Sequence, residues 1–156
     1  MFRCIIVPTM KAKEITKQAI IISEDTTLRE AIERMNKEHT NTLLVTGEGG
    51  VLTGEVSVSD LLDAVIPENL TGDEVLEHFT DETVLINAIK DAADRPVYEF
   101  MVCDFSSVTP EDDLITIAAN AIGYQRARIP VVDKDNRPIG IISRQGLKRI
   151  LSRYLS

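Results

Sequence analysis

The feature that most constrains the fold of this chain is an internal repeat with an offset of 86 residues. Gly54 corresponds to Gly140, Ser57 to Ser143, and Leu61 to Leu147. The apolar pattern continues backwards without a gap over roughly 45 residues of each copy. Because only two copies are present, the repeat predicts a paired module rather than a solenoid.

The first copy predicts a strand, a helix and two further strands. Alternating or continuous apolar residues indicate strands at 19–23, 42–46 and 51–58, and the glycine-rich segment 47–50 favours a hairpin turn between the last two. Thr27 and Glu30 have the spacing of a capping box, so we expect a helix to begin there. A second helix is expected to follow, beginning with Leu61 and Leu62.

The second copy predicts the same order of elements. A strand is expected at 105–108, followed by a helix from Pro110 and Glu111. A strand at 128–132, a turn at 133–136 and a strand at 138–143 are expected next, and a last helix at 144–154. The chain is therefore predicted to be α/β (α+β), built from two β-α-β-β-α repeats. We place the first repeat at 10–66, the second at 96–155, and a helical insert at 67–95.

The insert between the repeats is polar with an apolar stripe. Asp73 is expected to cap one segment, and Thr80 or Asp81 another, so either one bent helix or two short helices would form. The apolar stripe requires a surface to cover it. That surface could belong to the rest of the module, a second subunit or another protein.

The junction of the 51–58 strand with the next helix is the first candidate site. Ser57, Ser59 and Asp60 lie where a strand ends and a helix begins. Free N–H groups and the positive end of the helix dipole favour an anion there, and a carboxylate can accept bonds from ribose hydroxyls. The alternative is that Ser59 and Asp60 simply cap the helix.

At this point the sequence resembles a known family. Each copy is similar to a cystathionine-β-synthase (CBS) domain, on the strength of the Ile129-Pro130-Val131-Val132-Asp133 run and the Gly-x-Ile/Val-Ser segments that begin at Gly54 and Gly140. The pair resembles a Bateman module, in which two repeats pack with pseudo-two-fold symmetry. The resemblance implies a regulatory, ligand-sensing module rather than an enzyme.

The resemblance also implies a ligand site. In the family, a cleft between the paired repeats receives adenosine-type ligands, so Asp60 would hold the ribose, Ser57 the ribose or phosphate, and Arg128 the phosphate. The implied ligand-binding residues are Ser57, Ser59, Asp60, Phe105, Ser106, Ser107, Arg126, Arg128 and Ile129. The alternative for Arg126 and Arg128 is a charged, exposed strand edge.

The mirror-related site departs from this pattern. Gly146 replaces the aspartate and Thr42 replaces Arg128, although Ser143 is retained. One adenosyl ligand per chain is therefore expected. AMP, ADP and ATP are the first candidates, with S-adenosylmethionine or a dinucleotide as alternatives, and no cofactor is required.

Composition argues against several other functions. The net charge of −8 disfavours nucleic acid as a partner, and no apolar run is long enough to span a membrane. Cys4 and Cys103 form no disulfide framework, which favours the cytoplasm. His39 and His78 have no metal-ligand spacing, and no nucleophile has a matched base, so neither a metal site nor catalysis is expected.

Apolar helix faces predict assembly. The faces at 28–35, 114–122 and 147–151 exceed what one small sheet per repeat can cover, so we expect a homodimer. The last helix also carries a basic cluster, for which a solvated face is the simplest interpretation. The alternative function is a ligand-independent adaptor that acts through its dimer surface, its insert and an unidentified protein partner.

Overall fold

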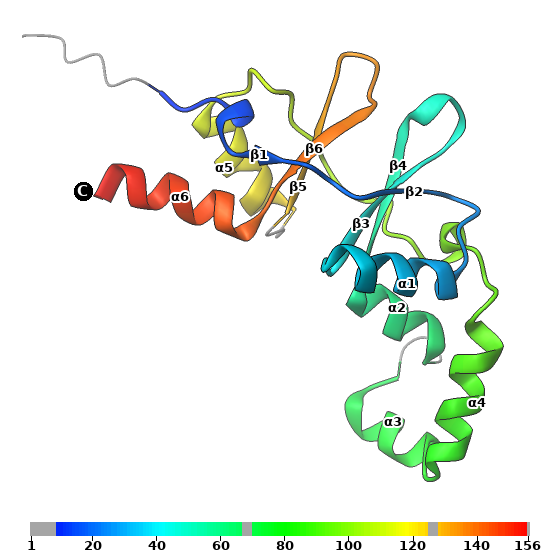
Figure 1. Cartoon of the computed structure of the whole chain (residues 1–156). Helices are drawn as coiled ribbons and strands as arrows, with labels where there is room; N and C mark the ends of the chain where they lie inside the picture. Colours follow the sequence, from blue (N-terminus) through cyan, green and yellow to red (C-terminus); the bar gives the residue numbers. More distant parts are fainter. Residues whose placement is uncertain (1–8, 67–69, 125–127, 156) are drawn as a thin grey trace, which may run out of the picture. The chain divides into compact units, whose positions relative to one another are not determined.

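The computed structural model describes residues 9–66, 70–124 and 128–155 and divides into two compact units (Figure 1). The first unit comprises residues 20–104. The second unit combines the segment before Ile20 with the segment from Phe105 onwards. Residues 2–7, whose apolar sequence predicts a short strand, lie outside the described residues, and so does Arg126.

The first unit contains a three-stranded sheet covered on one face by helices (Figure 1). The strands are β2 (Ile21–Ser23), β3 (Thr42–Thr46) and β4 (Leu52–Ser57). β2 pairs parallel with β3, and β3 pairs antiparallel with β4. The covering helices are α1 (Leu28–Glu38) and α2 (Val58–Val65). Thr27 and Glu30 form the expected capping box, because the Thr27 N–H donates to the Glu30 carboxylate at 2.8 Å.

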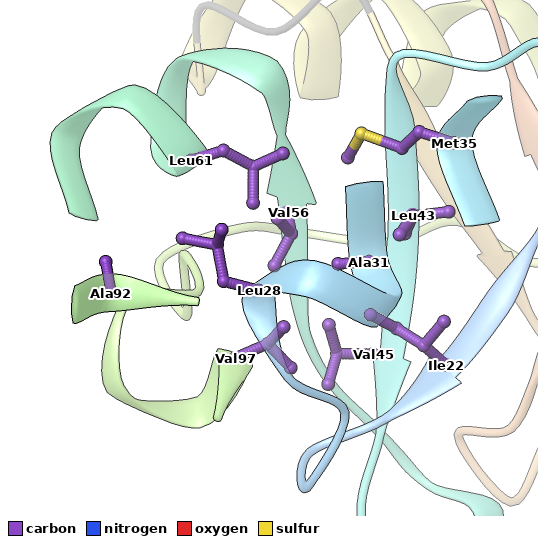
Figure 2. Packing of buried hydrophobic residues seen from close by; sticks show 10 residues of the cluster. All are labelled: Ile22, Leu28, Ala31, Met35, Leu43, Val45, Val56, Leu61, Ala92 and Val97. Carbon is purple, nitrogen blue, oxygen red and sulfur yellow. The ribbon is translucent and has the colours of Figure 1, made fainter. Parts of the chain in front are cut away.

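The hydrophobic core of the first unit lies between this sheet and its helices (Figure 2). Leu28 from α1 and Leu61 from α2 pack towards strand residues such as Val45 and Val56. These four side chains are buried because the apolar positions of the helices recur at helical spacing while those of the strands face one side of the sheet. The core therefore fixes the point where β4 runs into α2.

The insert forms two helices, α3 (Gly72–His78) and α4 (Glu82–Ala92). Asp81 caps α4 as expected, but the expectation for Asp73 was wrong, since Thr71 caps α3 and Asp73 lies inside it. The end of the insert is tied to both covering helices. Arg95 donates from Nη1 to the carbonyl of Ala64 at 2.7 Å. The N–H of Leu28 donates to the carbonyl of Arg95 at 2.9 Å.

The second unit repeats this plan. Its sheet has the order β1-β6-β5, formed by β1 (Thr16–Lys17), β6 (Pro138–Ile142) and β5 (Ile129–Val132). Its helices are α5 (Leu114–Gly123) and α6 (Arg144–Leu155). A separate core forms from buried residues of these elements: Met10, Ala12, Ile15, Val108, Ile117, Ile129, Val131, Ile142 and Ile150. The predicted α/β class with two small sheets is thus confirmed.

Each unit includes a segment from the beginning of the other repeat. Lys17 pairs with Ile141 at the edge of β6, and Val102 exchanges two backbone hydrogen bonds with Glu55 of β4, at 2.9 and 3.0 Å. Close approach of these segments explains the glycine shared by the two strands. A Cβ atom at Gly140 would lie 2.6 Å from the carbonyl oxygen of Lys17. A compact unit is therefore not identical with a sequence repeat.

Three expectations for the second repeat need correction. No strand forms at 105–108; only Val108 makes a bridge, to Val131. Pro130 explains this, because it has no N–H to donate where Leu44 of the first unit donates to Ile20. The helix expected from Pro110 begins at Leu114, since residues 109–112 form a turn and Asp113 caps the helix. Ile122, whose apolar character and helical spacing predict an inward-facing position on this helix, is exposed.

Candidate functional site

The junction of β4 and α2 holds Ser57 and Asp60 together. The helix begins at Val58 rather than at Leu61, because Ser57, not Ser59 or Asp60, is its N-cap. The Asp60 carboxylate accepts from the Ser57 N–H at 2.7 Å and from the Ser57 hydroxyl at 2.8 Å. Asp60 therefore has the capping role that was the alternative interpretation of this residue.

This capping arrangement leaves part of the carboxylate open. Both bonds from Ser57 end on Oδ2, so Oδ1 makes no hydrogen bond within the described part of the chain. Asp60 is only partly buried, and Ser59 is exposed at the second position of the helix. A ligand hydroxyl can thus donate to Oδ1, whereas the N–H groups in the first turn of α2 favour an anionic group.

Thr42, which the sequence assigns only to the mirror-related site, lies next to this junction as well. Thr42 of β3 lies opposite Ser57 of β4. Its side chain is buried, with 6% of the residue exposed, and its hydroxyl Oγ1 has no hydrogen-bond partner within the described residues. A buried hydroxyl without a partner costs free energy, so the first unit combines a partly open carboxylate with an unsatisfied hydroxyl.

The adjoining backbone completes this group of residues. The carbonyl of Asn41 accepts from the Val58 N–H at 3.2 Å, which ties the start of β3 to the start of α2. On its other side, β4 pairs with Val102. The available signal for that pairing was Gly54, because a glycine inside a strand indicates close approach of another backbone. Met101 and Val102 do contact the position of a Cβ at Gly54.

The second unit holds the equivalent junction with different residues. Ile129 pairs with Ile142, which places Arg128 directly before β5, close to the end of β6. Ser143 follows β6 and accepts from the Gly146 N–H at 3.4 Å. Gly146 stands where Asp60 stands in the first unit, and a Cβ there would lie 3.2 Å from the carbonyl of Ile15. Close packing therefore disfavours any larger residue at this position.

The cation of this second group is Arg128. Burial and the charge of Arg144 both lower the pKa of the Arg128 guanidinium, with burial the larger cause. An arginine nevertheless remains charged in proteins. Two cations that repel each other across a partly buried position favour an anion that would bridge them, such as a phosphate.

The remaining predicted residues lie in this unit as well. Phe105, Ser106 and Ser107 are partly buried and irregular, directly before the Val108 bridge. The predicted site residues with a described position therefore fall into two groups. Ser57, Ser59 and Asp60 belong to the first unit, and Phe105, Ser106, Ser107, Arg128 and Ile129 belong to the second.

The described residues contain neither a metal-binding cluster nor a helix that could span a membrane. Within 9–66, 70–124 and 128–155, no group of three or more His, Cys, Asp or Glu side chains could hold a metal ion. In the described part of the chain, every helix is too short or too polar to cross a membrane. The two groups of polar residues at the strand–helix junctions are therefore the candidate sites.

Comparisons with known proteins give sequence relatives and solved structures with the same fold. The chain is 27% identical over 134 residues to the choline transport ATP-binding protein OpuBA of Bacillus subtilis, covering 86% of this chain but only 28% of that protein. The CBS domain pair of protein MJ0100, solved in complex with 5′-methylthioadenosine and S-adenosyl-L-methionine, has a TM-score of 0.67 at 19% identity and covers 94% of this chain and 98% of its own.

A plant protein shares the fold. The structure of CBSX2 in complex with AMP has a TM-score of 0.67 at 20% identity, covering 94% of this chain and 98% of its own; CBSX2 comes from Arabidopsis thaliana. The sequence model of the CBS domain matches this chain twice, over residues 12–67 and 97–153. The chain therefore belongs to the CBS domain family, and it carries two CBS domains.

Proposed function

We propose that this protein is a cytoplasmic regulatory module that binds one adenosyl ligand per chain. The observation that carries the proposal is the pair formed by Ser57 and Asp60, in which, among the described residues, one carboxylate oxygen of Asp60 has no hydrogen-bond partner. Two solved CBS structures with the same fold contain AMP or S-adenosyl-L-methionine. Both ligands present a ribose diol, which is the chemistry that an open carboxylate accepts.

The ribose would be held by Asp60. Hydrogen bonds from a diol to an ionised carboxylate are charge-assisted, each worth roughly 1.5–3 kcal/mol. Because Ser57 fixes Oδ2 from the backbone and the side chain, Oδ1 is held in place before the ligand arrives. A preorganised acceptor lowers the entropy cost of binding.

The phosphate of a nucleotide would be held by Arg128. A guanidinium can donate two parallel bonds to phosphate oxygens, and an anion would relieve the repulsion between Arg128 and Arg144. The assignment of Asp60 and Arg128 to one and the same ligand stays a prediction. It can be tested by measuring the affinity of one ligand for an Asp60 variant and for an Arg128 variant.

Regulation requires two states of the protein with different affinities for the ligand. The absence of an acidic residue at Gly146 predicts that only the junction of the first unit has the ribose acceptor. We therefore expect a single tight site per chain. AMP, ADP and ATP are the leading ligands, and S-adenosylmethionine or a dinucleotide are the alternatives.

A thermal-shift screen followed by calorimetry tests the proposal. Adenosine, AMP, ADP, ATP and S-adenosylmethionine would be compared with GMP as a control for the base. A ligand that binds only the folded state stabilises it by mass action and so raises the melting temperature. At a free ligand concentration of 100 times Kd, the stabilisation is about 2.7 kcal/mol. We expect a shift with at least one adenosyl ligand, and a stoichiometry near one per chain.

The same screen separates the adaptor alternative. If no adenosyl ligand shifts the melting temperature, the module works without a ligand in its junctions, and its helical insert becomes the candidate for function. We expect no turnover of ATP, ADP or AMP by the purified chain, since no nucleophile with a matched base was identified near Ser57 and Asp60.

A further inference from the structure

Among the described residues, the helical insert is buried in the first unit at one end only. Helix α3 has no buried residue, and Ala92 at the end of α4 is the only buried residue of the two insert helices. The outer part is open to solvent, with Leu76 of α3 73% exposed and Ile86 of α4 47% exposed. Helices with so little burial belong to the least stable part of a fold. The insert is therefore an arm that depends on its attachment to the rest of the unit (Figure 1).

That attachment lies at the end of α4. Ala92 belongs to the same core cluster as Leu28 of α1 and Leu61 of α2 (Figure 2). The carbonyl of Arg95 accepts from the Leu28 N–H at 2.9 Å, and the carbonyl of Ala93 accepts from the next N–H of α1 at 3.0 Å. These N–H groups lie in the first turn of α1, where the helix itself offers them no carbonyl. The end of the insert thus supplies acceptors that α1 lacks.

The side chain of Arg95 binds the other covering helix. Its Nη1 donates to the carbonyl of Ala64 at 2.7 Å, and its Nε donates to the Glu99 carboxylate at 2.8 Å. The guanidinium also lies 5.9 Å from the centre of the Phe100 ring. Glu99 and Phe100 therefore hold the planar guanidinium in the orientation that reaches α2.

The acceptor of this bond lies at the end of α2. Ala64 is the last residue but one of this helix (Val58–Val65), so its carbonyl has no N–H of the same helix to accept from. The C-terminal end of a helix also attracts a cation. The opposite end begins with Ser57 and Asp60, the proposed ribose site. Because α2 has eight residues, its two ends are only about 12 Å apart.

We propose that Arg95 is a positioning residue that couples the ligand site at the start of α2 to the helical insert. This inference rests on the proposed function, since it requires a ligand bound at Asp60. Leu61 holds α2 in the core, so the short helix acts as one rigid element between its two ends. A ligand that orders the first turn of α2 thereby strengthens the contact between Ala64 and Arg95 and orders the insert.

Thermodynamic linkage makes this coupling measurable from both ends. If the attached insert raises the affinity for the ligand by a certain factor, the ligand stabilises the attachment by the same factor. The Kd of a variant without the attachment should therefore rise by the factor by which saturating ligand slows the opening of the insert. We expect both factors to be about fivefold or more, which is the lower limit of typical coupling between two sites.

Hydrogen exchange and calorimetry on the full chain test the coupling. AMP is the first probe, and S-adenosylmethionine is the second if AMP does not bind. In the wild type, the bound probe should slow exchange of the amides of α4, residues 82–92, by about fivefold or more. Arg95→Met keeps an unbranched side chain but has no donor, so it should raise the Kd about fivefold and abolish this slowing. Arg95→Lys keeps the charge without the planar fork and should give intermediate values.

Three further variants separate coupling from stability. Arg34→Met is the matched control, because Arg34 forms the same kind of i,i+4 ion pair, with Glu38 inside α1. It should leave the Kd and the slowing within about twofold of the wild type, since exposed ion pairs contribute little. Glu30→Ala removes the capping box of α1 and should lower stability while the slowing persists. Glu99→Gln leaves the cation but weakens its support, so it should reduce the slowing even if Arg95→Met does not fold.

The outcomes distinguish failure of this inference from failure of the proposed function. Binding with unchanged exchange of α4 in the wild type would overturn the coupling and leave the ligand site intact. Equal slowing in the wild type and in Arg95→Met would show that the coupling does not pass through Arg95. A Kd that rises equally in Arg95→Met and Glu30→Ala would assign the effect to stability and overturn the inference. Failure of both probes to bind would also overturn it, and the thermal-shift screen decides separately whether the proposed function fails as well.

Discussion

The Oδ2 atom of Asp60 accepts two hydrogen bonds from Ser57, one from its backbone N–H at 2.7 Å and one from its hydroxyl at 2.8 Å. The same pair of residues therefore begins α2 and presents a carboxylate at the end of β4. Loss of ligand binding in an Asp60 variant could thus arise from a missing ligand contact or from a frayed helix. The chain itself contains the control that separates these causes.

Asp60→Ala should abolish tight binding of every adenosyl ligand and lower stability by about 1 kcal/mol, the usual scale for a lost cap. Glu30→Ala removes the same kind of capping box, at the start of α1 in the same unit. This control should also lower stability but should bind the ligand with unchanged Kd. Calorimetry and chemical denaturation on both variants make the comparison. Full binding by Asp60→Ala would show that the ribose acceptor is wrongly assigned.

Arg128→Ala should weaken the binding of nucleotides more than the binding of adenosine, because only nucleotides carry the phosphate to which the guanidinium would donate hydrogen bonds. Losing one charge-assisted contact corresponds to roughly tenfold to a hundredfold in Kd. Arg128→Lys keeps the charge but not the fork and should give an intermediate Kd for AMP or ATP. Equal effects of Arg128→Ala on adenosine and AMP would contradict a phosphate contact.

Gly140→Ala should destabilise the protein by about 1–3 kcal/mol, as overpacking typically does. The added Cβ would lie 2.6 Å from the carbonyl oxygen of Lys17, and this backbone cannot move without disturbing β1. Gly54→Ala should cost less, because its nearest neighbour is the flexible side chain of Met101. Gly72→Ala, with nothing within 4 Å, is the matched control and should be close to neutral. Urea denaturation of the three variants provides the ranking.

Stability should fall in acid as the helix caps are protonated. A hydrogen bond from the Thr27 backbone holds the pKa of Glu30 below its ordinary value of 4.5. The Glu30 carboxylate therefore binds a proton more readily in the unfolded chain than in the folded one. Its contribution to the free energy of unfolding is complete above about pH 4.5 and is lost as pH falls through the folded-state pKa. The same direction applies to Glu74, Asp81 and Asp113, each held by a backbone N–H of its own cap.

Glu30→Gln provides the measurement for this effect. Its free energy of unfolding should differ from that of the wild type at pH 7, and the difference should shrink towards pH 3. A difference that stays constant across this range would show that the carboxylate charge of Glu30 does not contribute to stability.

Local signals in the sequence were sufficient for most of the elements. The Thr27–Glu30 spacing and the run from Ile129 to Val132 predicted a helix start and a strand, and both are present. These features depend on residues near one another in the chain, and capping and strand formation act over that range. The 86-residue repeat likewise predicted two similar sheets.

Other features depended on residues distant in sequence, and only the tertiary structure decided them. Strand pairing between Lys17 and Ile141, and between Val102 and Glu55, divides the chain into units that differ from its repeats. That division groups Asp60 with Thr42 in one unit and Arg128 with Ser143 in the other. A sequence specifies which residues can pair. Packing of the whole fold decides which segment forms hydrogen bonds with the backbone of an edge strand or with a buried hydroxyl.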